Sequence, residues 1–381
     1  MKILHTADWH LGAYLGNFSR IDEQAIFLQQ LLCITEENDI DIVIVAGDIY
    51  DTLNPSAAAE SLFYNTMARL SEMKIPVVFV AGNHDSAERL GAIIPVVSEL
   101  GVHIFSEPGF IEINTKGQSA VIAAMPFVSE KRLNEAIFTT GNEATMQKEY
   151  SAKVASIFEN LTANFRPDAT NIAVGHFHIA GGETSKGLER DILQIGGVFA
   201  VHPNDMPNNA DYIAMGHLHR AQKITCGDGL AHYSGSPLPY SLSERGQPKS
   251  VNIVHISSGQ NAVIEKVFLD CPKPIELWTV ATAADAIEKC KQSSNAYKYI
   301  VITDEHTIST YDIKEMKRLT GSIVSIELSA NEQSMSEINM ESLQVLSPRE
   351  EFASFYETAK GVPPTTQIIK IFDEILTQEE S

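Results

Sequence analysis

Short apolar runs alternate with helix-prone stretches over the first 255 residues of the chain. Two of these runs, Ile40–Ala46 and Pro76–Ala81, are rich in β-branched residues and are followed by glycine, which is typical of strands buried on both faces. Because helical patterns separate the runs, their order predicts an α/β protein with layered sheets and helices. The other expected strands are Lys2–Thr6, Val121–Ala124, Ile172–Val174 and Tyr212–Met215, and the expected helices are Asp22–Glu37, Ala57–Met73 and Arg89–Leu100.

A polar, helix-prone stretch at Ser129–Asn164 is typical of an insertion between strands. The pattern changes near Cys271, where two closely spaced prolines favour a linker over the interior of an element. We therefore predict a first domain at 1–270, a small α/β domain at 271–330, a polar linker at 331–346 and a helical pair at 347–381. Within the small domain the expected order is strand Ile275–Val280, helix Thr282–Lys291, strand Tyr297–Thr303, helix Ile313–Leu319 and strand Ile323–Leu328.

The C-terminal tail carries clear helix signals. Ser347-Pro348-Arg349-Glu350 has the spacing of a capping box, and the helix that follows is expected to end at Gly361. A second helix, rich in isoleucine, is expected to run to Leu376. One interpretation is that this apolar surface packs back on its own chain, and the other is that it docks on a groove or coiled coil of another protein.

Composition and charge narrow the class of protein. The 381 residues are 44% hydrophobic, and 28 basic against 49 acidic residues give a net charge of −21, which argues against a protein that coats nucleic acid. The four cysteines form no CxxC pair, so we expect reduced thiols in the cytoplasm. The N-terminus resembles no signal peptide, and no apolar run approaches the roughly 20 residues that span a membrane.

Metal-capable side chains directly follow several of the predicted strands. A single Asp-x-His or Gly-Asp would be nearly uninformative, but five such segments in this order are very improbable by chance. Because the carboxyl ends of parallel strands share one edge of a sheet, these side chains predict a mixed oxygen and nitrogen site for one or two divalent metals. The segments are Asp8-Trp9-His10, Gly47-Asp48, Gly82-Asn83-His84-Asp85, Gly175-His176-Phe177-His178 and Gly216-His217-Leu218-His219.

Together these segments resemble the five sequence blocks of the calcineurin-like metallophosphoesterases. The opening words His5-Thr6-Ala7-Asp8-Trp9-His10-Leu11-Gly12 and the later Tyr233-Ser234-Gly235-Ser236-Pro237 are similar to the SbcD family of nuclease subunits. The resemblance implies a four-layer metallophosphoesterase-type sandwich, with two sheets flanked by helices. It also implies that the small domain caps the site and that the helical pair serves as a docking element.

The resemblance also implies roles for individual residues. His84 would stabilise the transition state and protonate the leaving oxygen, and Asp51 would orient and charge His84. An ordinary turn or capping role for Asp51 stays open. His178 departs from the family pattern and is interpreted as structural or as supporting a ligand. One metal would be held by Asp8, His10, Asp48 and His219, and a second by Asp48, Asn83, His176 and His217, with Asp48 bridging.

The function implied is that of a manganese-dependent DNA nuclease, a 3′→5′ exonuclease on duplex ends and an endonuclease on single strands and hairpins, in DNA repair, recombination and replication. Its partner would be an SbcC-type coiled-coil ATPase bound through 347–376, in a heterotetramer that contains a homodimer of this chain. The alternative is a stand-alone phosphodiesterase for nucleotides, and a metal-free scaffold is disfavoured because no ligand position is lost. The acidic charge predicts weak DNA binding by this chain alone.

Overall fold

The computed structural model describes residues 1–128, 143–184, 199–260, 262–292, 294–304 and 307–329, with the isolated positions 356, 364, 365, 368 and 369. The predicted linker at 331–346 and nearly all of the predicted helical pair lie outside these residues. The chain divides into two compact units, Met1–Leu328 and Ser329–Ser381, and all the named helices and strands belong to the first.

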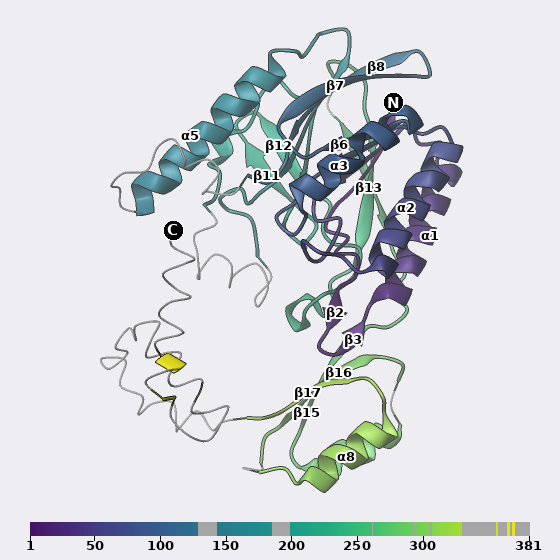
Figure 1. Cartoon of the computed structure of the whole chain (residues 1–381), viewed down its shortest axis with the longest axis vertical. Helices are drawn as coiled ribbons and strands as arrows, with labels where there is room; N and C mark the ends of the chain where they lie inside the picture. The colour runs from purple at the N-terminus through teal and green to yellow at the C-terminus, as the bar shows by residue number, and fades with distance from the viewer. Residues whose placement is uncertain are drawn as a thin grey trace. The chain divides into compact units, whose positions relative to one another are not determined.

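Two six-stranded sheets form the centre of the first unit (Figure 1). Sheet one has the order β14 (Val263–Phe268), β13 (Ser250–His255), β1 (Lys2–Thr6), β4 (Ile42–Ala46), β5 (Val77–Val80), β6 (Val102–Phe105). Sheet two has the order β11 (Gln222–Cys226), β12 (Gly229–Tyr233), β10 (Tyr212–Gly216), β9 (Thr170–His176), β8 (Gln118–Met125), β7 (Gly109–Thr115). A short hairpin joins β2 (Tyr14–Leu15) and β3 (Phe18–Ser19), and 3-10 turns lie at η1 (Ser98–Leu100), η2 (Pro203–Asp205) and η3 (Leu242–Glu244).

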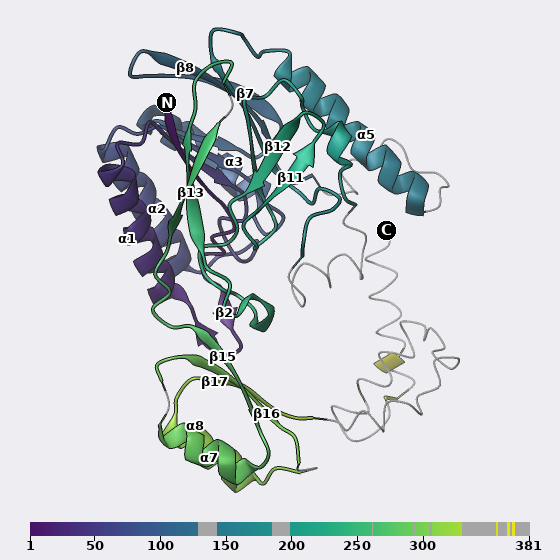
Figure 2. The ribbon, with the colours of Figure 1, turned by 180° about the vertical axis from the view of Figure 1, so that it is seen from behind.

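The sheets pack face to face, and helices cover both outer faces. Ile3 of β1 and its neighbour Leu4 point to opposite sides, the first between the sheets and the second under the helices, as the two-residue repeat of a strand requires. Sheet one is covered by α1 (Ile21–Glu37), α2 (Ala57–Glu72) and α3 (Ala87–Val97), and sheet two by α5 (Glu143–Thr162). Figure 2 shows α5 on the side of β11 and β12, away from α1 and α2. This confirms the predicted four-layer sandwich.

The helix starts follow from the sequence. Ser56 caps α2 by accepting a hydrogen bond from the Ala59 amide, and Ser86 caps α3 by accepting one from the Arg89 amide. The central strands β1, β4, β5 and β6 run parallel, as do β8, β9, β10 and β12. Parallel pairing therefore brings their carboxyl ends to one edge of each sheet.

The small domain has the strand and helix order that the sequence predicts. Its parallel sheet, β15 (Ile275–Val280), β16 (Tyr297–Ile302) and β17 (Ile323–Leu328), is joined through α7 (Ala283–Lys291) and α8 (Thr310–Leu319). It has a hydrophobic core of its own around Trp278, but Tyr297 also donates a 2.7 Å hydrogen bond to the Glu23 carboxylate of α1. This contact ties the small domain to the sandwich, and the boundary at 270 stays a prediction. Among the described residues no helix is long and apolar enough to cross a membrane.

Candidate metal centre

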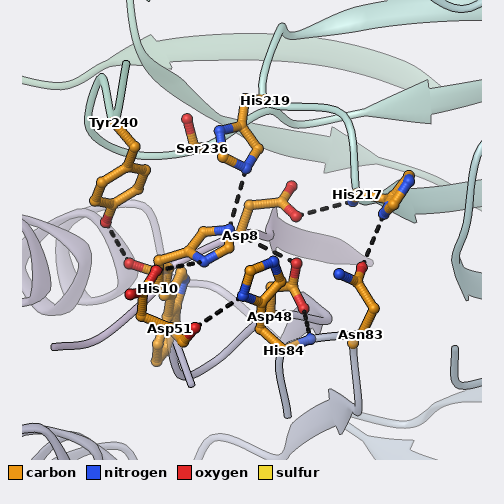
Figure 3. Close-up of polar contacts among 12 residues, drawn as sticks. Asp8, His10, Asp48, Asp51, Asn83, His84, His217, His219, Ser236 and Tyr240 are labelled. Atoms are coloured by element: carbon orange, nitrogen blue, oxygen red, sulfur yellow. Dashed lines mark hydrogen bonds and ion pairs between the residues drawn. The ribbon is translucent and has the colours of Figure 1, made fainter. Parts of the chain in front are cut away.

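All seven predicted metal ligands lie at the carboxyl ends of parallel strands. Figure 3 labels all of them except His176. The two sheets approach closely there: a Cβ on Gly216 would lie 1.8 Å from the Ala46 carbonyl oxygen, so only glycine fits at the end of β10. Because β4 and β10 belong to different sheets, this close approach brings the ligands of both sheets into one pocket. The ligands come from β1 (Asp8, His10), β4 (Asp48), β5 (Asn83), β9 (His176) and β10 (His217, His219).

The backbone at four of these ligands is left-handed. Asp8, His10, Asp48 and His217 have φ values of 54°, 47°, 48° and 95°, although none of them is glycine. Such conformations cost free energy and persist where the surrounding structure enforces them, most often at functional sites. Hydrogen bonds between the loops enforce them here, including those from the Asp8 amide to the Gly47 oxygen at 3.0 Å and from the His10 amide to the Asp48 oxygen at 3.0 Å.

The first group of ligands contains Asp8, His10 and His219, whose ligand atoms lie within 4.8 Å of one another. The Nε2 atoms of His10 and His219 face each other at 3.1 Å (Figure 3). All three side chains are buried, and Oδ2 of Asp8 has no hydrogen-bond partner. A buried carboxylate oxygen without a partner is costly unless a cation satisfies it.

The second group is arranged around Asp48 and His176. The Asp48 carboxylate lies 3.2 Å from His176 Nε2 and 3.6 Å from His10 Nε2, so Asp48 reaches both groups. Oδ1 of Asn83 contacts His176 Nε2 at 3.1 Å and His217 Nδ1 at 2.9 Å. One carboxylate between two clusters of donors is the arrangement expected of a bridging ligand.

Protonation differs across the pocket. Burial lowers the pKa of His10, and burial together with His176 lowers the pKa of His217 well below its ordinary value. Burial also opposes a charge on His176, but Asp48 and Asp8 outweigh it and raise the pKa of His176 to about 9. Burial raises the pKa of Asp8 to about 6, whereas His176 and His84 overcome the burial of Asp48 and hold its pKa well below the ordinary range.

These donors fit divalent metals. Carboxylates, one amide oxygen and imidazoles are suitable ligands for divalent first-row transition metals. The unpartnered Asp8 oxygen and the two facing imidazole nitrogens are also what a bound cation would satisfy. The chain therefore carries a divalent-metal site at the shared edge of its two sheets.

His84 and Asp51 lie beside this pocket in a way that the sequence predicts only in part. His84 Nδ1 contacts the backbone oxygen of Asp51 at 2.8 Å, whereas the Asp51 carboxylate lies 3.2 Å from His10 Nδ1. The backbone of Asp51 thus orients His84, and its side chain faces a metal ligand instead. The reason is the course of the loop after β4, in which the Asp51 amide bonds to the Leu11 oxygen and turns the carboxylate toward His10. A ligand atom of His84 also lies within 4.8 Å of His10 and Asp48, which the sequence did not predict.

The structure gives roles to three residues for which the sequence predicted none. The buried Asp85 carboxylate accepts hydrogen bonds from the amides of Gly82, Ile49 and Tyr50 at 2.8 to 3.1 Å, and so joins the loops after β4 and β5. Its place directly after His84 was the available signal. Tyr240 packs against His10 and donates to the Trp9 carbonyl oxygen, and Glu244 lies behind His219. His178 belongs to none of the metal-capable groups found among the described residues.

The amino-acid sequence matches a known class of enzymes. A family model described as calcineurin-like phosphoesterase matches residues 1–221, more than half of the chain. Two relatives are both named as SbcD-type members of the SbcCD nuclease. That of Bacillus subtilis (strain 168) is 37% identical over 100% of this chain and 99% of its own. That of Rhodobacter capsulatus is 36% identical over 68% of this chain and 67% of its own.

Solved structures show weaker similarity. A dimetal phosphatase from Danio rerio matches with a TM-score of 0.38 and 12% identity, over 70% of this chain and 95% of that chain. The sequence relatives are decisive, because one of them extends over the whole chain at 37% identity. The chain belongs to the calcineurin-like phosphoesterases and, within them, to the SbcD family of nuclease subunits, and it is therefore a hydrolase.

Proposed function

We propose that this chain is the catalytic subunit of an SbcCD-type complex and hydrolyses DNA phosphodiesters with two divalent metals, preferably manganese. It acts as a 3′→5′ exonuclease on duplex ends and as an endonuclease on single strands and hairpins. The observation that carries the proposal is the convergence of seven donors in one pocket, in a chain that aligns along its full length with a nuclease subunit. Mixed carboxylate and imidazole ligation suits manganese, although iron and zinc use similar ligands.

The proposed ligands are divided between the two metals. Asp8, His10, Asp48 and His219 hold one metal, and Asp48, Asn83, His176 and His217 hold the other. Bound divalent metals supply Lewis acidity and lower the pKa of water for attack on phosphorus.

His84 completes the site without acting as a ligand. Its amide donates to Asp48 Oδ1 at 2.8 Å, and its ring, held by the Asp51 carbonyl, stabilises the transition state and helps to protonate the leaving oxygen. The role of the Asp51 side chain is then to orient His10.

The net charge of −21 fits a subunit that cuts DNA held by a partner. Two divalent cations would make the pocket locally positive, but the 49 acidic residues of the chain outnumber its 28 basic residues, which opposes extensive DNA binding outside the pocket. We assign the holding of DNA to an SbcC-type ATPase that binds the segment 347–376, with two copies of this chain in the assembly. The domain at 271–330 caps the site and orients the duplex.

The test is a nuclease assay on end-labelled duplex and hairpin DNA with manganese, with and without the ATPase, alongside a small phosphodiester. We expect weak DNA binding by this chain alone and a strong gain in binding and cleavage with the ATPase. Efficient turnover of the small diester without cleavage of DNA would support a stand-alone phosphodiesterase instead. Tight, salt-resistant DNA binding by this chain alone would contradict the proposal that the ATPase holds the DNA while this chain cuts it.

A further inference from the structure

A buried ion pair lies directly behind the metal ligand His219. Glu244, at the end of η3, is 0% exposed, and Lys249, just before β13, is 4% exposed. Lys249 Nζ donates to Glu244 Oε2 at 2.5 Å. Burying two charges is expensive, so a pair this deep calls for a specific reason.

Glu244 is fully hydrogen-bonded, and His219 is one of its partners. Oε1 accepts from His219 Nδ1, the Tyr240 amide and the Ser241 hydroxyl, each at 3.2 Å. Because an ionised carboxylate is only an acceptor, the Nδ1 atom of His219 must carry the proton of this contact. The other ring nitrogen, Nε2, is then left with its lone pair, and it faces His10 Nε2 at 3.1 Å.

Lys249 also contacts His219, at the backbone of that histidine. Its three donors reach Glu244, the Ser236 hydroxyl at 2.8 Å and the carbonyl oxygen of His219 at 3.2 Å. The ion pair therefore contacts His219 at two points: Glu244 at the ring and Lys249 at the main chain. It is also neutral as a whole, so Glu244 can accept from the imidazole without adding net negative charge behind the pocket.

The histidines of the two metal groups are supported differently. A carboxylate oxygen lies 3.2 Å from Nδ1 of both His10 and His219, that of Asp51 and that of Glu244, and the Glu244 contact is a hydrogen bond. His176 instead donates from Nδ1 to a backbone oxygen, that of Ala46, at 2.7 Å. A carboxylate behind an imidazole fixes its tautomer and makes it a stronger metal ligand than a carbonyl does.

We propose that Glu244 and Lys249 are positioning residues for the first metal: they fix His219 as the Nδ1–H tautomer with Nε2 aimed into the pocket. The inference rests on the proposed two-metal function and deepens it, because it assigns the pair to one metal and not to the other. Neither residue touches substrate, and each acts through His219.

The test is a titration of the whole metal-free chain with manganese, followed by calorimetry, which needs no DNA. The variant is the double substitution Glu244→Gln with Lys249→Met, which removes both charges and leaves no unpaired ion. We expect one of the two sites to lose roughly tenfold to a hundredfold in affinity, as for other residues behind ligands, and the other to stay within about twofold. Excess manganese should restore most of the lost nuclease activity.

Lys298→Met is the matched control, because Lys298 is a buried lysine of the small domain whose Nζ donates to the Ser294 and Ala296 carbonyls at 2.7 and 2.9 Å. It should leave both affinities unchanged. Two unaltered sites in the double variant, or an equal loss at both sites, would overturn the proposal. If the wild type binds two metals but does not cut DNA, the proposed substrate fails while this assignment stands.

A second measurement is made on the wild-type protein, and a variant is needed only to assign its signals. In wild-type protein loaded with zinc, nitrogen NMR of labelled histidines should show His219 protonated at Nδ1 and metal-bound at Nε2. The signals can be assigned with His219→Gln. A proton on Nε2 would overturn the proposal even if the double variant fails to fold.

Discussion

The two proposed metal positions differ in what stands behind their ligands. At the first, both histidines are backed by carboxylates, and Asp8 adds an oxygen without a partner. At the second, a backbone carbonyl backs His176 and an amide, that of Asn83, takes the place of a carboxylate. The first position is therefore the more strongly donating one, which predicts tighter metal binding there. Two metals in one pocket need not be equivalent even when one aspartate joins them.

Removal of Asp48, the ligand shared by the two proposed metal positions, should weaken metal binding at both. Asp48→Asn takes the bridging carboxylate from both groups, so we expect loss of both metals and a fall in kcat of about a thousandfold or more. Calorimetric metal titration and a manganese-dependent nuclease assay measure this. Asp48→Asn protein that still binds one metal tightly would show that Asp48 serves a single position.

Replacing His84 should separate chemistry from metal binding at both positions. His84→Ala should keep two metals, because the ring is not a proposed ligand, while kcat falls by about a hundredfold to ten-thousandfold with the loss of proton transfer. Single-turnover cleavage of end-labelled duplex gives the rate, and metal content gives the control. Intact turnover would remove His84 from the mechanism, and loss of one metal would make it a ligand.

Single ligand substitutions should weaken one position at a time. His219→Gln should weaken the first metal and His176→Gln the second, each by about a hundredfold, since each removes one imidazole donor. Competition titration with a metal-sensitive dye resolves the two affinities. If both substitutions reduced the same affinity, the division of ligands between the positions would be wrong.

The release of protons on metal binding is the smallest expected effect. The pH dependence of metal affinity should distinguish the two metal positions. His176 is protonated at pH 7 in the metal-free protein because its pKa is about 9, whereas the lowered pKa of His10 leaves that ring neutral. Binding at the second position must therefore release about one proton, and its affinity should rise from pH 7 to pH 9. Calorimetry in buffers of different ionisation enthalpy counts the proton. Release of a proton when metal fills only the first position would contradict the assignment of His176 to the second.

Local patterns in the sequence predict most of the fold. The bounds of β1, β15 and β17 match the apolar runs, and α1 and α2 differ from the expected helices by one residue at one end. The third helix differs more: α3 ends at Val97 and continues as a 3-10 turn to Leu100, after Pro95 inside the helix. Helix ends commonly tighten into such 3-10 turns, and Gly101, with a left-handed φ of 72°, ends this one.

The sequence predicts the metal ligands of the site but not the contacts of the residues around them. The ligands could be predicted because each directly follows a strand, and parallel strands end at one edge. Asp51 and Glu244 could not be placed in the same way, because their contacts depend on how loops fold over the sheet edge. The Glu244–His219 contact joins two loops 25 residues apart, and no periodic pattern specifies it.

The central claim is that two metals bind at this edge of the sheets, in unequal surroundings. Anomalous scattering from crystals of the manganese-loaded protein tests it most directly. We expect two peaks, one among Asp8, His10, Asp48 and His219 and the other among Asp48, Asn83, His176 and His217, with the first peak the stronger at limiting manganese. A single peak, or peaks away from these side chains, would contradict the claim.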